Sequence, residues 1–156
     1  MTLRAIWAFE PVLIPDSFGA DRRPPSQLIE ASRRRRLVFA SVDEAVARFR
    51  SKPPFSACEE AAVRAYVEIG STPQADGTIR LTCSGETEAQ IYESNEQLDF
   101  STFAAITCPV VVAAGAEIAM GNDIPPLVAP LVADALPNGT LLTMPGVTHF
   151  APMEDG

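Results

Sequence analysis

The segment Ile106–Met144 constrains the fold more than any other part of the chain. Its β-branched run Pro109–Ala114 (PVVVAA) has the length of one strand, and its apolar run Leu141–Met144 has the length of another. Between them lies a helix-length segment with apolar residues on one face and two prolines in its first turn, where proline is tolerated. Strand, helix and strand in this order are typical of a βαβ unit, so we expect a parallel sheet.

A third apolar run, Leu3–Phe9 (LRAIWAF), begins almost at the first residue. Near-continuous apolar runs favour strands that are buried on both faces, as in parallel sheets. Pro11 ends the run, because proline has no N–H to donate to a neighbouring strand. We therefore expect the three apolar runs to form neighbouring parallel strands of an α/β domain.

The middle of the chain has a different, mainly helical pattern. Ser41–Arg50 begins with a capping box, Ser41 and Glu44, and carries an apolar stripe. Ser56 with Glu59 repeats the capping pattern before a second helix. Thr78–Thr82 alternates like a strand, and Glu86–Ser94 reads as a third helix. These elements predict a mainly helical region outside the parallel sheet.

Composition excludes several classes of protein. The chain has 156 residues and a net charge of −8, which argues against a general nucleic-acid-binding protein. No apolar run reaches the roughly 18 residues that cross a bilayer, so we expect no membrane association. The run Arg33–Arg36 could contact an anion, but the acidic whole favours a solvated surface.

Cysteine usage points to a reducing compartment. Cys58, Cys83 and Cys108 are widely spaced, with no CxxC pair, and a single histidine cannot complete an ordinary zinc site. We expect free thiols, a cytoplasmic protein, and neither a metal nor a cofactor.

The one histidine of the chain, His149, follows the last apolar run and a Pro145-Gly146 turn. An imidazole on a loop directly after a strand can be exposed and yet rigidly held, which suits a general base. The alternative is a histidine with only a structural role.

Several of these features together resemble the second half of the α/β-hydrolase family. The strand, the Pro-Gly turn, His149 and the following Phe150–Asp155 (FAPMED) are similar to the end of that family's core, and Leu3–Phe9 with Glu10-Pro11 resembles the strand after the nucleophile helix. The resemblance implies a partial α/β-hydrolase core in residues 1–15 and 98–156, and a cap region in residues 16–97. It also implies that His149 is the catalytic base of a nucleophile–histidine–acid triad.

Three carboxylates are candidates for the triad acid. Glu117 and Asp123 follow the strand-like run Pro109–Ala114, where the resemblance places the acid of most members, although Ile118 occupies the more usual aspartate position. Asp123 could instead cap a helix. Glu10 matches members in which the acid ends the earlier strand. The sequence leaves these three alternatives open.

No nucleophile is recognisable. The family presents it in a Gly-x-Ser-x-Gly turn, and the nearest sequence here, Ser84-Gly85, lacks the first glycine and a preceding strand. The N-terminal half of the family's core and its oxyanion loop also have no counterpart. We therefore expect a piece of a hydrolase of small esters, epoxides or related bonds, inactive alone and able to take a small-molecule substrate only when completed.

A second interpretation is a non-catalytic α/β domain that binds a small molecule or a partner chain. Under either interpretation a sheet edge left without a neighbour favours self-association.

Overall fold

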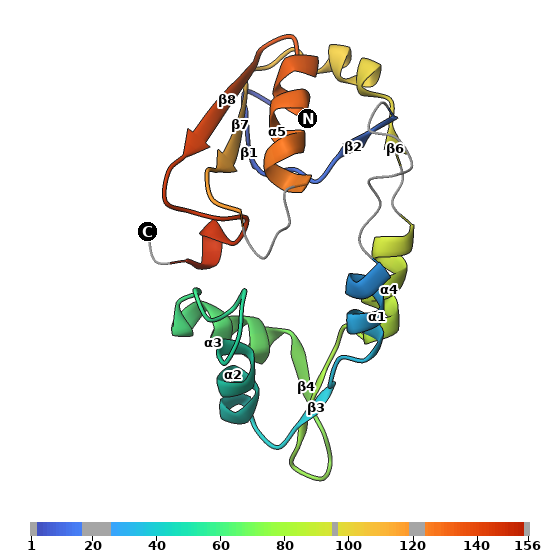
Figure 1. Cartoon of the computed structure of the whole chain (residues 1–156), viewed down its shortest axis with the longest axis vertical. Coiled ribbons are helices and arrows are strands. Elements are labelled where there is room, and N and C mark those ends of the chain that lie inside the picture. The colour runs from blue at the N-terminus through green and yellow to red at the C-terminus, as the bar shows by residue number, and fades with distance from the viewer. Residues whose placement is uncertain (1–2, 17–25, 95–96, 119–123, 155–156) are drawn as a thin grey trace. The chain divides into compact units, whose positions relative to one another are not determined.

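The computed structural model of the chain describes residues 3–16, 26–94, 97–118 and 124–154. These residues form two compact units (Figure 1). Unit 1 comprises residues 1–19 and 96–152, and unit 2 comprises residues 20–95 and 153–155, the ends of each range including residues that are not described. The division of the chain into a core and a cap remains a proposal.

Unit 1 contains a three-stranded parallel sheet, in agreement with the prediction of neighbouring parallel strands. Its strands are β1 (Ile6–Phe9), β7 (Val110–Gly115) and β8 (Gly139–Met144), in the order β1-β7-β8. Both neighbouring pairs are parallel. Strand β1 begins at Ile6 where the sequence predicts Leu3, and β8 begins at Gly139 where it predicts Leu141.

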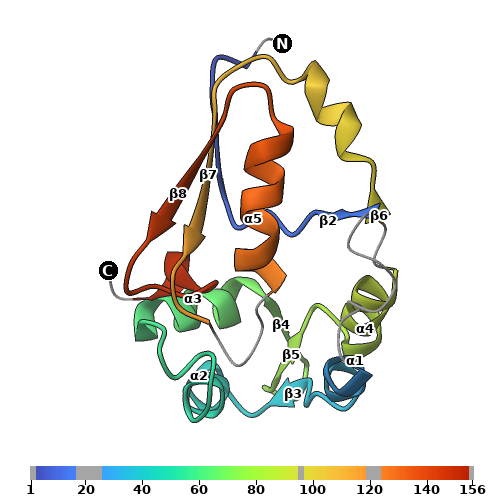
Figure 2. The ribbon, with the colours of Figure 1, turned by 45° about the horizontal axis from the view of Figure 1, so that its top comes forward.

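One face of this sheet is covered by α5 (Ile124–Ala135), as Figures 1 and 2 show. Side chains of β7 and α5 interdigitate there and form a core of small and branched residues: Val110, Val112, Ala114, Val128, Ala129, Val132, Ala133 and Leu136. The helix continues past Pro130, although a proline inside a helix usually kinks or ends it. Burial of this apolar face against the sheet explains how the helix persists without the hydrogen bond that proline cannot donate.

The opposite face of the sheet is more exposed. Trp7 on β1 is 59% exposed and Leu142 on β8 is 45% exposed, whereas Val112 on the covered face is fully buried. The expectation that the first strand is buried on both faces is therefore wrong for this chain. The reason is that Trp7 lies on the face opposite to the one that α5 covers.

Unit 1 is completed by two short pieces. Strand β2 (Ile14–Pro15) pairs in parallel with β6 (Gln97–Leu98), and the 3-10 helix η3 (Phe100–Ala105) follows β6.

Unit 2 is mainly helical, as expected. Its helices and strands are α1 (Ser26–Arg33), β3 (Val38–Phe39), α2 (Val42–Arg50), α3 (Glu60–Ile69), β4 (Ser71–Pro73), β5 (Ile79–Leu81) and α4 (Gly85–Glu93). The three strands form an antiparallel sheet in the order β3-β5-β4.

The two predicted capping boxes have different outcomes. Ser41 caps α2, its hydroxyl accepting a bond from the Glu44 N–H at 3.1 Å, and the Glu44 carboxylate accepts from the Ala40 N–H at 2.7 Å. Ser56 caps nothing, because α3 begins only at Glu60. The second prediction is therefore wrong in its starting residue.

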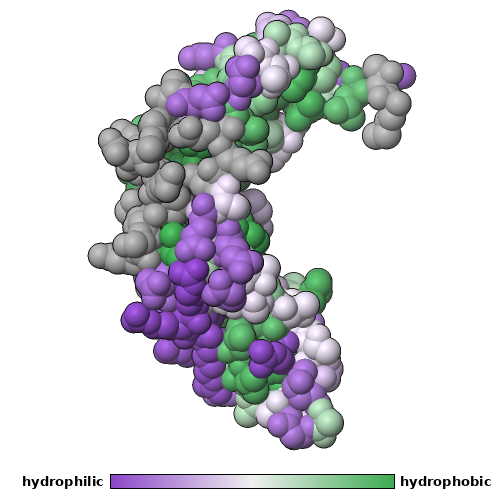
Figure 3. Space-filling view, turned by 90° about the vertical axis from the view of Figure 1, so that its right-hand side faces the viewer, coloured by the Kyte–Doolittle hydropathy of each residue, from purple (hydrophilic) through white to green (hydrophobic). Residues whose placement is uncertain are grey.

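The arginine run of unit 2 forms ion pairs with the unit's own carboxylates. Arg33 contacts Glu86 at 3.0 Å and Glu93 at 2.8 Å, and Arg35 contacts Glu88 at 2.8 Å. The Arg33 pairs join α1 to α4, and the Arg35 pair joins the segment after α1 to α4. Hydrophilic side chains gather on the face of unit 2 seen in Figure 3. The run is an ion-paired surface, as the acidic composition suggests.

None of the described helices is both long and apolar enough to cross a membrane.

Candidate active site

Glu10 occupies an unusual position directly after β1. Its φ of 38° lies in the left-handed region, which residues other than glycine seldom adopt. Its N–H donates to the carbonyl oxygen of Ala113 at 2.8 Å, so the turn is tied to the neighbouring strand β7. The result is a side chain that leaves the end of β1 and is fully buried.

Both oxygens of the Glu10 carboxylate have partners. Oε1 accepts a hydrogen bond from the Gly115 N–H at 2.8 Å, and Oε2 lies 2.6 Å from Nδ1 of His149. A carboxylate that is removed from water needs such partners, since an unpaired buried charge is costly. The backbone turn and these two bonds fix the carboxylate at the end of the parallel sheet.

The loop that carries His149 is held against the end of β7. The N–H of Ala116 donates to the carbonyl of Met144 at 2.9 Å, and the N–H of Glu117 donates to the carbonyl of Val147 at 3.1 Å. Gly115 makes this approach possible, because a Cβ there would lie 2.5 Å from the Val147 oxygen. A larger residue would push the loop away from the strand.

His149 is thereby oriented without being enclosed. Its side chain is 31% exposed, and its ring meets the ring of Phe150 edge-on with centroids 5.6 Å apart. An ionised carboxylate can only accept, so pairing with ionised Glu10 requires the imidazole proton on Nδ1. Nε2 is then the nitrogen that can take a proton from another group, as a general base requires.

The structure describes two of the three candidate acids. Glu10 contacts His149, whereas Glu117 is exposed on the loop after β7 and bonds to Val147 through its backbone N–H. Asp123 lies outside the described residues. Spacing along the sequence could not select Glu10, because it lies 139 residues from the histidine.

The nearest sequence to a nucleophile turn has a structural role. The Ser84 hydroxyl accepts from the N–H of Thr87 at 3.0 Å and caps α4. Gly85 permits close packing of α4 on α1, since a Cβ there would lie 2.1 Å from the Ser32 carbonyl oxygen. Ser84-Gly85 therefore starts a helix of unit 2.

Comparison with known proteins adds information at the level of the fold. No protein-family model matches the sequence, and no curated protein matches it closely enough to be significant. Solved structures do match. The peroxisomal α/β-hydrolase of Saccharomyces cerevisiae aligns over 97% of this chain with a TM-score of 0.67 and 19% identity.

Two further solved structures also match this chain. E-2-(acetamidomethylene)succinate hydrolase aligns over 97% of this chain with a TM-score of 0.61 and 19% identity, and the thioesterase domain of the curacin biosynthetic pathway aligns over 95% with a TM-score of 0.60 and 12% identity. This chain has part of the α/β-hydrolase fold. The fold prediction from the sequence is thus confirmed.

The α/β-hydrolase likeness covers about half of each larger structure. The aligned part amounts to 42% of the yeast protein, 52% of the succinate hydrolase and 53% of the thioesterase domain. At these identities the likeness establishes the fold, while activity and substrate are matters for proposal.

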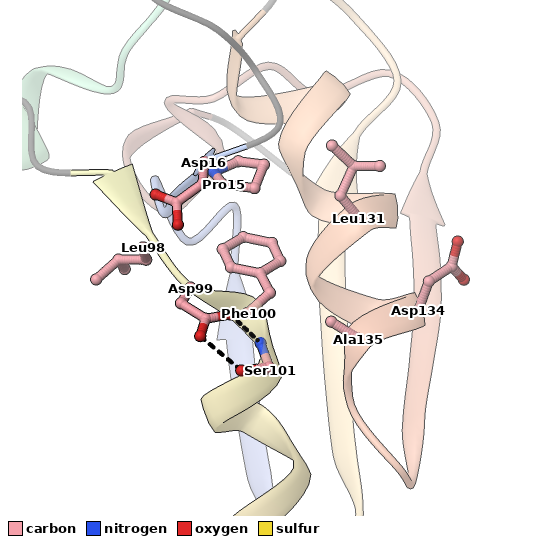
Figure 4. Close-up of a pocket in the computed structure, with 9 residues that line it drawn as sticks. All are labelled: Pro15, Asp16, Leu98, Asp99, Phe100, Ser101, Leu131, Asp134 and Ala135. Carbon is pink, nitrogen blue, oxygen red and sulfur yellow. Dashed lines mark hydrogen bonds between the residues drawn. The ribbon is translucent and has the colours of Figure 1, made fainter.

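A separate open cavity of about 490 Å³ lies elsewhere in unit 1 (Figure 4). It is bounded by β2, the start of η3 and the C-terminal half of α5. The side chain of Asp134 points away from it, and the Asp99 carboxylate is engaged with Ser101 at 2.6 Å. Neither Glu10 nor His149 lines it, so this cavity is distinct from the candidate site.

The candidate site offers little to a metal. Within residues 3–16, 26–94, 97–118 and 124–154, histidine, cysteine and carboxylate side chains nowhere gather in a group of three or more that could hold an ion. At the site itself, the pairing of Nδ1 with Glu10 is the arrangement of an acid–base pair.

Proposed function

We propose that this chain supplies the histidine and the acid of a hydrolase triad, with His149 as general base and Glu10 as its acid partner. The observation that carries the proposal is the 2.6 Å contact between Glu10 Oε2 and His149 Nδ1. In such a triad the base takes the proton of the nucleophile and the acid stabilises the imidazolium that forms.

The position of the pair supports this assignment. Glu10 follows β1 and His149 follows β8, so both lie beyond the carboxyl ends of parallel strands. Ligands of open α/β sheets bind at this end of the strands. An exposed imidazole held by a buried carboxylate there is suited to act on a bound substrate.

The proposed reaction is hydrolysis of a small ester, epoxide or related bond, and it needs a nucleophile and oxyanion donors from outside the described residues. Acyl transfer is slower by orders of magnitude when the nucleophile or the oxyanion donors are missing. We propose that a further polypeptide segment completes the site and that small substrates bind only to the completed protein.

The test is to express the chain joined in frame to the coding sequence upstream of it, and to assay the product with short-chain aryl esters and epoxides. We expect turnover, with kcat reduced at least about a hundredfold by His149→Ala or Glu10→Gln. Glu117→Gln is the matched control and should keep kcat within about twofold, as expected of a surface substitution. Turnover that is indifferent to Glu10→Gln would remove Glu10 from the triad.

A second candidate function is a non-catalytic α/β domain that binds a small molecule or a partner chain. The observation that favours it is the capping role of Ser84, which leaves Ser84-Gly85 no part in a nucleophile turn. The same experiment distinguishes the two functions. If the chain joined to its upstream segment folds but hydrolyses neither esters nor epoxides, the result would favour the binding domain.

A further inference from the structure

His149 lies in a tight turn that a single residue, Thr148, closes twice. The backbone carbonyl of Thr148 accepts a hydrogen bond from the N–H of Ala151 at 3.0 Å. Its side-chain hydroxyl accepts a second hydrogen bond from the N–H of Phe150 at 3.1 Å. Threonine hydroxyls form such turns with the N–H two residues further along the chain. The backbone that follows His149 is therefore tied back to the residue that precedes it.

The hydroxyl bond is local to this turn. Backbone hydrogen bonds from the N–H groups of Ala116 and Glu117 already anchor the loop to the end of β7. The bond between the Thr148 hydroxyl and Phe150 spans only the histidine itself. What it fixes is therefore the backbone conformation at His149, which sets the direction in which the imidazole leaves the chain.

Thr148 also packs against the residue that holds the acid. A Cβ at Gly115 would lie 3.0 Å from the carbonyl carbon and oxygen of Thr148, so the Thr148 peptide group lies close against Gly115. The N–H of Gly115 in turn donates to Glu10 Oε1 at 2.8 Å. Acid and base are thus both positioned from Gly115, the acid through the Gly115 N–H and the base through the Thr148 turn.

The contact between Glu10 and His149 depends on this positioning. Hydrogen bonds weaken steeply as distance and angle depart from their preferred values, and Oε2 of Glu10 lies 2.6 Å from Nδ1 of His149. The Glu10 carboxylate is fully buried and fixed, whereas the imidazole is partly exposed and only partly enclosed by its neighbours. The turn that carries the imidazole therefore contributes to its orientation.

We propose that Thr148 is a positioning residue, whose hydroxyl holds the turn in the conformation that directs Nδ1 of His149 at Glu10 and makes Nε2 available as the base. The inference rests on the proposed function, because it concerns the same acid–base pair. Threonine suits this role, since its branched Cβ restricts the rotation that carries the hydroxyl. Thr148 acts through His149 and has no part in the reaction itself.

Three variants separate the hydroxyl from the shape of the side chain. Thr148→Val keeps the branched shape and removes the acceptor, Thr148→Ser keeps the acceptor, and Thr143→Val is the matched control at an exposed position of β8. In nitrogen-15 NMR spectra of the chain, Thr148→Val should weaken the downfield Nδ1–H signal of His149 and let the proton of the neutral imidazole distribute over both nitrogens. Thr148→Ser and Thr143→Val should keep the spectrum of the unaltered chain.

Two further measurements follow the same variants. Amide hydrogen exchange tests the bond itself, and Thr148→Val should speed exchange at the Phe150 N–H by about five- to tenfold, as expected for the loss of one hydrogen bond. In the chain joined to its upstream segment, Thr148→Val should lower kcat by roughly ten- to a hundredfold with little change in KM, because misplacement of a catalytic group slows the chemical step. Thr148→Ser should restore most of that loss.

The outcomes distinguish this inference from the proposed function. A spectrum in which Thr148→Val keeps the Nδ1–H signal of the unaltered chain would overturn the positioning role and leave the acid–base pair intact. Equal loss of the signal in Thr148→Ser would also overturn it, since the hydroxyl would then not be what matters. A neutral imidazole without a proton on Nδ1 in the unaltered chain would contradict the pair itself. If Thr148→Val does not fold, a Phe150 amide in the unaltered chain that exchanges as fast as in an unstructured peptide would still overturn the proposal.

Discussion

At the scale of single residues, the site depends on a strained glutamate and a glycine that allows two loops to meet. Glu10 holds its left-handed backbone because its N–H and both carboxylate oxygens are bonded. Conformations of this kind cost about 1–3 kcal/mol and concentrate at functional sites. The strain and the contact with His149 therefore point to the same role.

Gly115 provides a test of the packing around that pair. In Gly115→Ala the new Cβ would meet the backbone of Val147 and Thr148, at 2.5 Å and 3.0 Å, which cannot rotate away. We expect a loss of about 1–3 kcal/mol in the free energy of unfolding, as for overpacking elsewhere. Urea denaturation measures it. Ala116→Ser, one residue further and exposed, should change stability by less than about 0.5 kcal/mol.

Residue patterns in the sequence predict the histidine but not its partner. His149 is recognisable from the strand and turn before it, whereas Glu10, Glu117 and Asp123 each satisfy a local pattern. The choice depends on which strand ends lie side by side, and on a backbone turn at Glu10 that no local propensity indicates. The contact between Glu10 and His149 is a long-range one that the sequence does not reveal.

At the scale of elements, the hydrophobic pattern predicts well which segments form strands and which form helices. It predicts less well the residue at which a helix begins. The three parallel strands and α2 and α4 appear where expected. Ser41 and Ser56 precede identical-looking patterns, yet only Ser41 caps a helix, because residues around Ser56 form turns that run up to Cys58. Capping depends on the path of the preceding chain.

The two serines give a matched pair of variants. Ser41→Ala removes the acceptor for the Glu44 N–H and should lower the free energy of unfolding by about 1 kcal/mol. Ser56→Ala should leave it unchanged within about 0.5 kcal/mol. Chemical denaturation measures both, and equal losses would contradict the cap assignment.

The same cap predicts a dependence on pH. The backbone N–H of Ala40 and then Arg36 hold the pKa of Glu44 below its ordinary value of 4.5. The folded protein therefore binds fewer protons at this group than the unfolded chain, so the stabilisation is present above pH 4.5 and is lost as the pH falls through the folded-state pKa.

Glu44→Gln isolates this effect. The wild-type chain should be the more stable of the two near neutral pH, and the difference in unfolding free energy should shrink as the pH falls below the ordinary pKa of the carboxyl group. Denaturation curves at a series of pH values measure it. A difference that does not vary with pH would contradict the assignment.

At the scale of the whole molecule, the chain has part of the α/β-hydrolase fold, and we propose that it supplies two of the three groups of a triad. The chain alone should hydrolyse short-chain aryl esters no faster than background, and His149→Ala should give the same rate. Robust turnover that this variant abolishes would show that a nucleophile is present within the chain.

The pairing of Glu10 with His149 is the central claim, and nitrogen-15 NMR tests it most directly because the chain has a single histidine. In the neutral form of the imidazole, the spectrum should show the proton on Nδ1, with a strongly downfield Nδ1–H signal, and an unprotonated Nε2. Glu10→Gln should remove that signal or shift the proton to Nε2, and Glu117→Gln should change neither. A neutral imidazole protonated on Nε2 in the unaltered chain, or a spectrum indifferent to Glu10→Gln, would contradict the account.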